Sequence, residues 1–116
     1  MVAFKQFQLG ASIVNPTSLQ FGPDGRIYAS EVDGTIKIFT VATTSSGGYT
    51  VTASETINLV ANMPNHNDNG TFNPNITGRQ VTGILVTGTA ANPVIYVSSS
   101  DPRIGAGTSQ NDTNLD

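Results

Sequence analysis

Apolar and polar residues alternate with a period of two through the first half of the chain, and no helical period is visible. Leu19 and Phe21 fall on one face of an expected strand, which ends at a turn over residues 22–25. This turn reads Gly-Pro-Asp-Gly, in which Pro presets φ and the last Gly accepts the positive φ of a reversal. The pattern therefore predicts a strand, a tight turn and a returning strand over residues 26–31.

Two further reversals predict two further strands. Residues 33–34 read Asp-Gly and residues 45–48 read Ser-Ser-Gly-Gly, both of which are typical of hairpin turns. The strand between these turns alternates between two faces, with Ile36 and Ile38 on one and Lys37, Phe39 and Val41 on the other. After the second turn, alternation continues to about residue 60. Four strands joined by short turns over residues 17–60 form a meander.

The alternation stops at residues 61–79, which are rich in Asn, Pro and Gly. A stretch of that length in a small domain is usually functional or flexible. Strand patterns return at residues 81–87 and, after a turn, at residues 94–97, a short apolar run suited to burial on both faces. From residue 98 onward the chain is polar to its end.

The two halves of the chain are alike. Each has an apolar strand, a turn containing Pro and a strand that carries Ile-Tyr, at residues 27–28 and 95–96. The insertion over residues 61–79 accounts for a spacing longer than common propeller repeats of about 40–50 residues. Chance likeness of two hairpins is the alternative interpretation. The sequence predicts an all-β fold, an antiparallel meander of about one and a half blades of a β-propeller.

Four short segments of the chain resemble a known family. Residues 21–28 read Phe-Gly-Pro-Asp-Gly-Arg-Ile-Tyr, and residues 33–36 read Asp-Gly-Thr-Ile. Residues 79–84 read Arg-Gln-Val-Thr-Gly-Ile, and residues 92–98 read Asn-Pro-Val-Ile-Tyr-Val-Ser. Together they resemble the first and second blades of soluble glucose/sorbosone dehydrogenase-type proteins, six-bladed β-propellers related to quinoprotein sugar dehydrogenases. The likeness covers most of residues 15–101.

The resemblance implies a full-length parent that oxidises sugars with pyrroloquinoline quinone (PQQ) and calcium. The family's catalytic base is a His of a later blade, so no catalytic residue is expected among these 116 residues. The family places a polar residue just before its second-blade Gly-Leu motif, which makes Gln80 the candidate cofactor-facing side chain. The implied partners are the remaining propeller blades, and a sugar substrate only in a full-length parent.

Composition narrows the classes of protein. Charged residues are 11% of the chain, its net charge is −3, and it has no cysteine. A disulfide scaffold, a zinc finger and a thiol nucleophile are therefore excluded. Five scattered basic residues form no stripe for phosphates, which argues against a nucleic-acid partner. No apolar run reaches the length of a membrane span, and the Thr- and Asn-rich composition favours a secreted or periplasmic protein.

Oxygen-rich segments are the candidate calcium sites. Asp101, Asp112 and Asp116 lie in the polar terminal loop, residues 101–116, where an acidic loop could gather them around a hard cation. Asp68 belongs to a loop in which Asn65, Asn67, Asn69 and Gly70 have the spacing of the first positions of a calcium loop. Ile76 stands where that loop requires a bidentate Glu. Loops without metal are the alternative in both places.

His66 is the one histidine of the chain, and it is either a general base or a solvated loop residue. No Gly-x-Ser-x-Gly elbow accompanies it, so nucleophilic catalysis is not expected. The chain is predicted to be a single partial β-propeller domain, with a blade over residues 15–60, a loop over 61–79 and the next blade starting at 80–100. The expected function is a non-catalytic blade fragment of an exported sugar-dehydrogenase-like propeller. The alternative is a structural or binding module that self-associates with its own copies through exposed strand edges.

Overall fold

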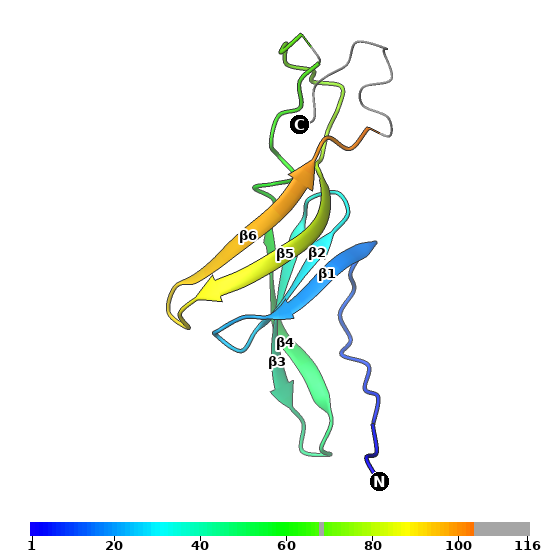
Figure 1. Cartoon of the computed structure of the whole chain (residues 1–116). Helices are drawn as coiled ribbons and strands as arrows, with labels where there is room; N and C mark the ends of the chain where they lie inside the picture. The colour runs from blue at the N-terminus through cyan, green and yellow to red at the C-terminus, as the bar shows by residue number, and fades with distance from the viewer. Residues whose placement is uncertain (68, 104–116) are drawn as a thin grey trace.

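The chain folds into two antiparallel sheets. The computed structural model describes residues 1–67 and 69–103, and among these it contains strands and no helix. The first sheet is a meander whose strands lie in chain order: β1 (Pro16–Phe21), β2 (Ile27–Glu31), β3 (Ile36–Thr43) and β4 (Tyr49–Ile57) (Figure 1). The second sheet is the hairpin β5 (Gln80–Gly88) and β6 (Pro93–Ser100). The all-β meander of about one and a half blades is confirmed.

The turn between β2 and β3 shows why the sequence requires Asp-Gly there. Gly34 has a φ of 95°, which side chains with a Cβ rarely adopt. A Cβ on it would lie 2.9 Å from the backbone of Ala61, so the long loop packs directly on this turn. Asp33 Oδ1 accepts a hydrogen bond from Thr35 N at 2.9 Å and closes the turn.

The hairpin β5–β6 packs against one face of the meander, which we call the stacked face (Figure 1). Its buried side chains are Tyr28, Ile36 and Ile38, and they meet Val86 of β5. Gln20 fastens the two sheets, because its amide accepts a hydrogen bond from Val86 N at 2.9 Å and donates one to Val86 O at 3.0 Å. The side chain thus satisfies both backbone groups of Val86, as a neighbouring strand would.

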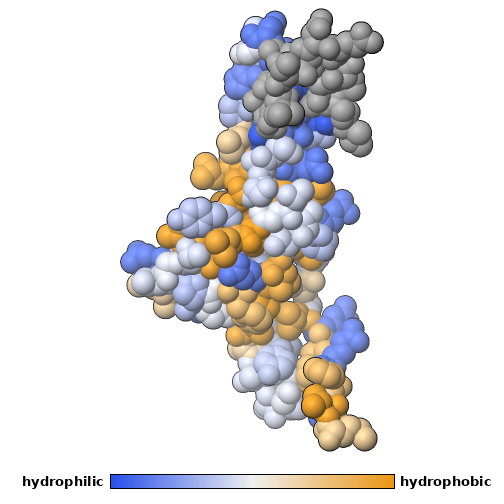
Figure 2. Space-filling view, viewed as in Figure 1, coloured by the Kyte–Doolittle hydropathy of each residue, from blue (hydrophilic) through white to orange (hydrophobic). Residues whose placement is uncertain are grey.

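The opposite face of the meander, which we call the free face, is only partly covered. Ile27, Ala29 and Phe39 form its centre, and Leu9 and Ile13 of the N-terminal segment pack on it. Leu19 and Phe21 share this face, as the alternation predicts, but they remain 66% and 64% exposed. Apolar side chains therefore reach the molecular surface around the middle of the molecule and along the N-terminal segment (Figure 2).

The two hairpins β1–β2 and β5–β6 repeat one register. In each, the pairing shifts at a single bulged threonine, Thr17 in β1 and Thr82 in β5. Each threonine shares a hydroxyl hydrogen bond with a serine of the partner strand, Ser30 at 2.9 Å and Ser98 at 3.3 Å. A bulge and a side-chain pair at matching positions are specific features of a strand pair. The two hairpins are therefore structural counterparts.

The long loop, residues 61–79, is organised by its own hydrogen bonds. Asn65 is fully buried, and its Nδ2 donates to the carbonyl oxygens of Ile76 at 3.1 Å and Gly78 at 2.9 Å. A bridge between His66 and Phe72 closes a small hairpin within the loop. The stretch without sequence periodicity therefore has a defined conformation that side chains, rather than alternation, impose.

Candidate functional site

The principal candidate site is a pair of unpartnered apolar faces rather than a catalytic cleft. One is the free face of the meander; the other is the outer face of the hairpin, formed by Leu85, Val94 and Tyr96. Leu85 is 53% and Tyr96 is 62% exposed. Large apolar side chains gathered on a face, rather than scattered singly, mark a surface that receives a partner.

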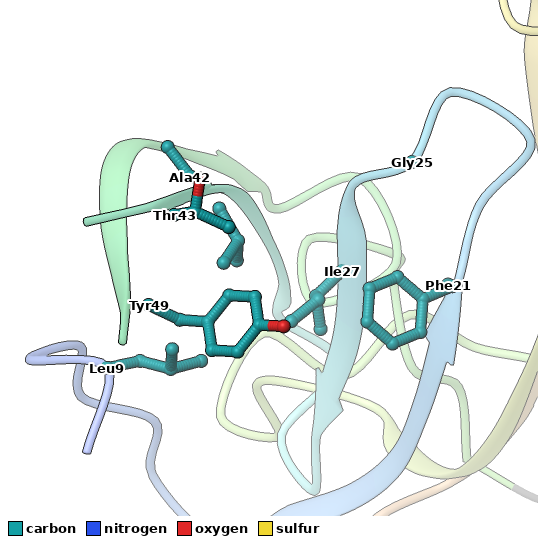
Figure 3. Close-up of a pocket in the computed structure, with 8 residues that line it drawn as sticks. Leu9, Phe21, Gly25, Ile27, Ala42, Thr43 and Tyr49 are labelled. Carbon is teal, nitrogen blue, oxygen red and sulfur yellow. The ribbon is translucent and has the colours of Figure 1, made fainter. Parts of the chain in front are cut away.

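Two grooves hollow the free face. The larger, of about 390 Å³, lies between Phe21, Ile27 and Tyr49, and Figure 3 shows the Tyr49 ring reaching from β4 toward Ile27 with Leu9 beside it. The smaller, of about 200 Å³, runs under residues 11–13 and is almost entirely apolar. Leu9 lines both grooves. The N-terminal segment therefore fills this face incompletely.

A polar cluster supports the opposite, stacked face. The hydroxyl of Tyr28 donates to Asp24 Oδ2 at 2.7 Å, and Arg26 donates to the same carboxylate through Nε. Burial alone would raise the pKa of Asp24, but the hydrogen bonds from Arg26 and Tyr28 outweigh it and lower the pKa from 3.8 to about 2. Burial, with the hydrogen bond to Asp24, raises the pKa of Tyr28. The Asp24 carboxylate thus links the turn over residues 22–25 to the buried Tyr28 of the sheet core.

This coupling predicts a loss of stability in acid. Because the pKa of Asp24 is lower in the folded chain, its ionised form stabilises the fold above pH 4, and this contribution disappears as the pH falls from about 4 to 2. Asp24→Asn is expected to lower the free energy of unfolding at pH 7 by on the order of 1 kcal/mol and to flatten its pH dependence in that window. Urea titrations between pH 2 and 7 measure both effects.

The matched control for Asp24 is Glu55→Gln. Glu55 Oε1 pairs with Arg26 at 2.6 Å, but its side chain is 63% exposed. An exposed ion pair contributes little, so this variant is expected to keep the acid-induced decrease in stability. An Asp24→Asn variant with an unchanged pH profile between 2 and 4 would contradict the assignment to Asp24.

The residue predicted to face a cofactor, Gln80, lies exposed at the start of β5. It lines a groove of about 350 Å³ together with Asp33 and Arg79. Arg79 is buried, and its NH1 donates to Asn65 Oδ1 at 2.8 Å; its Nε has no hydrogen-bond partner among the described residues. A groove with one guanidinium and one carboxylate offers too little positive charge to hold a polycarboxylate quinone by itself.

The Asn-rich loop directs its amide oxygens at hydrogen-bond donors. Asn67 Oδ1 accepts from Asn73 Nδ2 at 2.8 Å, and Asn69 Oδ1 accepts from Thr71 N at 3.0 Å. Asn65 Oδ1 faces the positive charge of Arg79. The Asn69 contact is an Asx-type turn, and the other two join side chains that are six and fourteen residues apart. Asp68, the carboxylate of the predicted calcium loop, lies outside the described residues, so that site stays a prediction.

Asp101 is a turn residue held by an arginine. It is 7% exposed, and Arg103 donates to its Oδ1 from the backbone N at 2.8 Å and to its Oδ2 from NH2 at 2.6 Å. These hydrogen bonds hold the pKa of Asp101 below its usual value. Asp33 makes the same backbone contact at the end of β2, so Asp101 repeats it one unit later. Asp112 and Asp116 lie outside the described residues, and residues 1–67 and 69–103 hold no group of three or more His, Cys, Asp or Glu side chains that could share a metal ion.

His66 lies half-buried beside the ring of Phe72, with centroids 6.2 Å apart in an edge-to-face arrangement. Its backbone O accepts a hydrogen bond from Arg103 at 2.8 Å, which joins the long loop to the end of β6. The general-base interpretation requires an acidic or nucleophilic partner in hydrogen-bond reach, and the contacts seen for His66 are structural.

Sequence reasoning missed the structural roles of Gln20, Asn65 and Arg79. Gln20 stands out only as the polar position between two apolar ones, a pattern that normally marks a solvent-facing side chain. Asn65 and Arg79 are fourteen residues apart, and no periodicity connects them. Their common signal is a polar side chain next to a turn, which is too frequent in this chain to single them out.

Comparison of the chain with family models, with curated proteins and with solved structures finds no match. The likeness to sugar dehydrogenase-type propellers therefore depends on the residues quoted above and stays a prediction. Within the part of the chain that the structure describes, no helix has the length and apolarity to cross a membrane.

Proposed function

We propose that the chain is a structural blade unit of a sugar-dehydrogenase-like β-propeller, which provides one complete blade and half of the next. The observation that carries this proposal is the face-to-face stacking of the meander on a hairpin that repeats its register. In repeat architectures each unit buries its apolar faces only against its neighbours. The two unpartnered faces are where the adjoining blades would pack.

The described residues support a scaffolding rather than a chemical role. Cofactor binding and sugar oxidation would belong to the assembled propeller, to which this chain would contribute Gln80 and the groove beside Arg79. The quinone and calcium would supply the redox chemistry there, and the other blades would have to provide further basic donors. The module would act by holding two sheets in a fixed stack.

The alternative, association through strand edges, has less support. The outer strand β4 is mostly exposed and carries Thr, Ser and Glu side chains, whereas the exposed apolar side chains lie on the faces. Edge pairing is favoured by flat, apolar edge strands. The faces are therefore the better candidates for contact.

The test is the covalent mass of the natively produced protein, followed by an assay of quinone-dependent sugar oxidation with added calcium. A single chain several times larger than 12.1 kDa, with oxidase activity in the whole protein, is the expected result. A native covalent mass of 12.1 kDa would overturn the propeller proposal and leave assembly as the function to study.

A further inference from the structure

The two free faces of the chain are counterparts of the two surfaces that already pack on each other within it. Matching β1–β2 to β5–β6 at their bulges places the pair Gln20–Tyr28 at the position of Leu85–Tyr96. The first pair belongs to the stacked face, and the second forms the outer face of the hairpin. The outer face of the hairpin therefore corresponds to the stacked face of the meander, on which the hairpin itself packs.

The same register relates the remaining faces. The free face of β1 and β2 consists of two cross-strand pairs, Leu19–Ala29 and Phe21–Ile27. Their matching positions in the hairpin are the pairs Ile84–Val97 and Val86–Ile95, which pack on the meander. The free face of the meander therefore corresponds to the inner face of the hairpin, which packs on the meander, and both faces are apolar.

From this correspondence we propose that the outer face of the hairpin packs on the free face of a second copy of this chain, repeating the sheet stack in trans. The inference rests on the proposed blade packing: in the 116-residue chain, a second copy takes the place of the adjoining blades. Every copy carries both matching surfaces, and the contact extends an interface that the fold already contains. The two surfaces differ, so the contact is heterologous and leaves one face open at each end of a pair.

The N-terminal segment covers part of the free face and would have to move for this contact to form. It lies on the free face through Leu9 and Ile13. A 3.3 Å hydrogen bond from Val51 N to Leu9 O and an edge-to-face contact between Phe7 and Tyr49 join it to β4. Two grooves remain open beside it. A docked hairpin would displace Leu9 and fill the grooves with Leu85 and Tyr96.

Charge substitutions on each face test the proposal by sedimentation velocity over a range of protein concentrations. Wild type is expected to form oligomers larger than dimers, because each copy has two complementary faces. Phe21→Asp on the free face and Leu85→Asp on the hairpin are each expected to weaken association about 100-fold, because a charge would be buried in an apolar contact. Thr52→Asp, on the exposed edge strand β4, is the matched control and should associate like wild type.

Mixing the two variants gives the decisive result. Each retains the face that the other has lost, so an equimolar mixture is expected to form dimers and nothing larger. Circular dichroism checks that each variant is folded, and Leu19→Asp and Tyr96→Asp replace a variant that is not. A wild-type chain that stays monomeric, variants that associate unchanged, or a mixture without dimers would overturn the second-copy partner. The covalent mass of the native protein judges the blade proposal separately.

Discussion

Tyr28→Ala is expected to lower the free energy of unfolding by about 3–5 kcal/mol, which is the typical cost of emptying a buried aromatic site. Tyr28 is 1% exposed and lies in the core between the two sheets. Its hydroxyl also holds Asp24, so the substitution removes a hydrogen bond along with the packing. In a domain with so few fully buried apolar residues, this loss is a large share of the total stability.

The matching tyrosine of the second hairpin, Tyr96, provides the control for this prediction. Tyr96 occupies the matching register position in the hairpin but is 62% exposed. Tyr96→Ala is therefore expected to change the free energy of unfolding of the dilute, monomeric chain by less than about 0.5 kcal/mol. Tyr28→Phe should cost about 1 kcal/mol, because only the hydroxyl contact is lost. Urea titrations followed by far-UV circular dichroism compare the three, and equal costs at Tyr28 and Tyr96 would contradict the stack as the core.

The strands were accessible from the sequence because their signals are local. The turns at residues 22–25 and 33–34 place the reversals, and alternation separates Ile36 and Ile38 from Phe39, which lie in two different clusters. These features depend on neighbouring residues and on the pleat of a strand. The number and order of the meander strands follow from them.

The sequence does not show which face of the meander the hairpin covers. Alternation places Leu19 and Phe21 together but cannot say that their face lacks a sheet, whereas the face of Gln20 receives one. That choice depends on where β5 and β6 pack, and the strands that meet there are more than sixty residues apart in the chain. Alternation of apolar and polar residues shows which side chains share a face of a strand, but it does not show what packs on that face. The same holds for the side-chain hydrogen bonds of the long loop, whose partners are backbone atoms in some cases and distant side chains in others.

Asn65→Ala is expected to lower the free energy of unfolding by about 3 kcal/mol, because it removes three hydrogen bonds from a fully buried site. Two of them hold the backbone carbonyls of Ile76 and Gly78, which lie just before β5. The third satisfies Arg79, whose guanidinium would then be buried with one partner fewer. The loop and the start of β5 should loosen together, as faster amide hydrogen exchange over residues 73–81.

An asparagine of the same loop provides the comparison. Asn69 is exposed and its Oδ1 holds only the local turn to Thr71, so Asn69→Ala is expected to cost less than about 1 kcal/mol and to leave exchange at residues 76–81 unchanged. Asn65→Asp keeps the acceptor for Arg79 but places a carboxylate against two carbonyl oxygens, so it should recover less than half of the loss. If the Ala variants at the two positions cost the same, Asn65 is not the residue that orders the loop. The approach of β5 to the meander then depends on Gln20, the apolar stack and the backbone hydrogen bond from Val81 N to Val32 O.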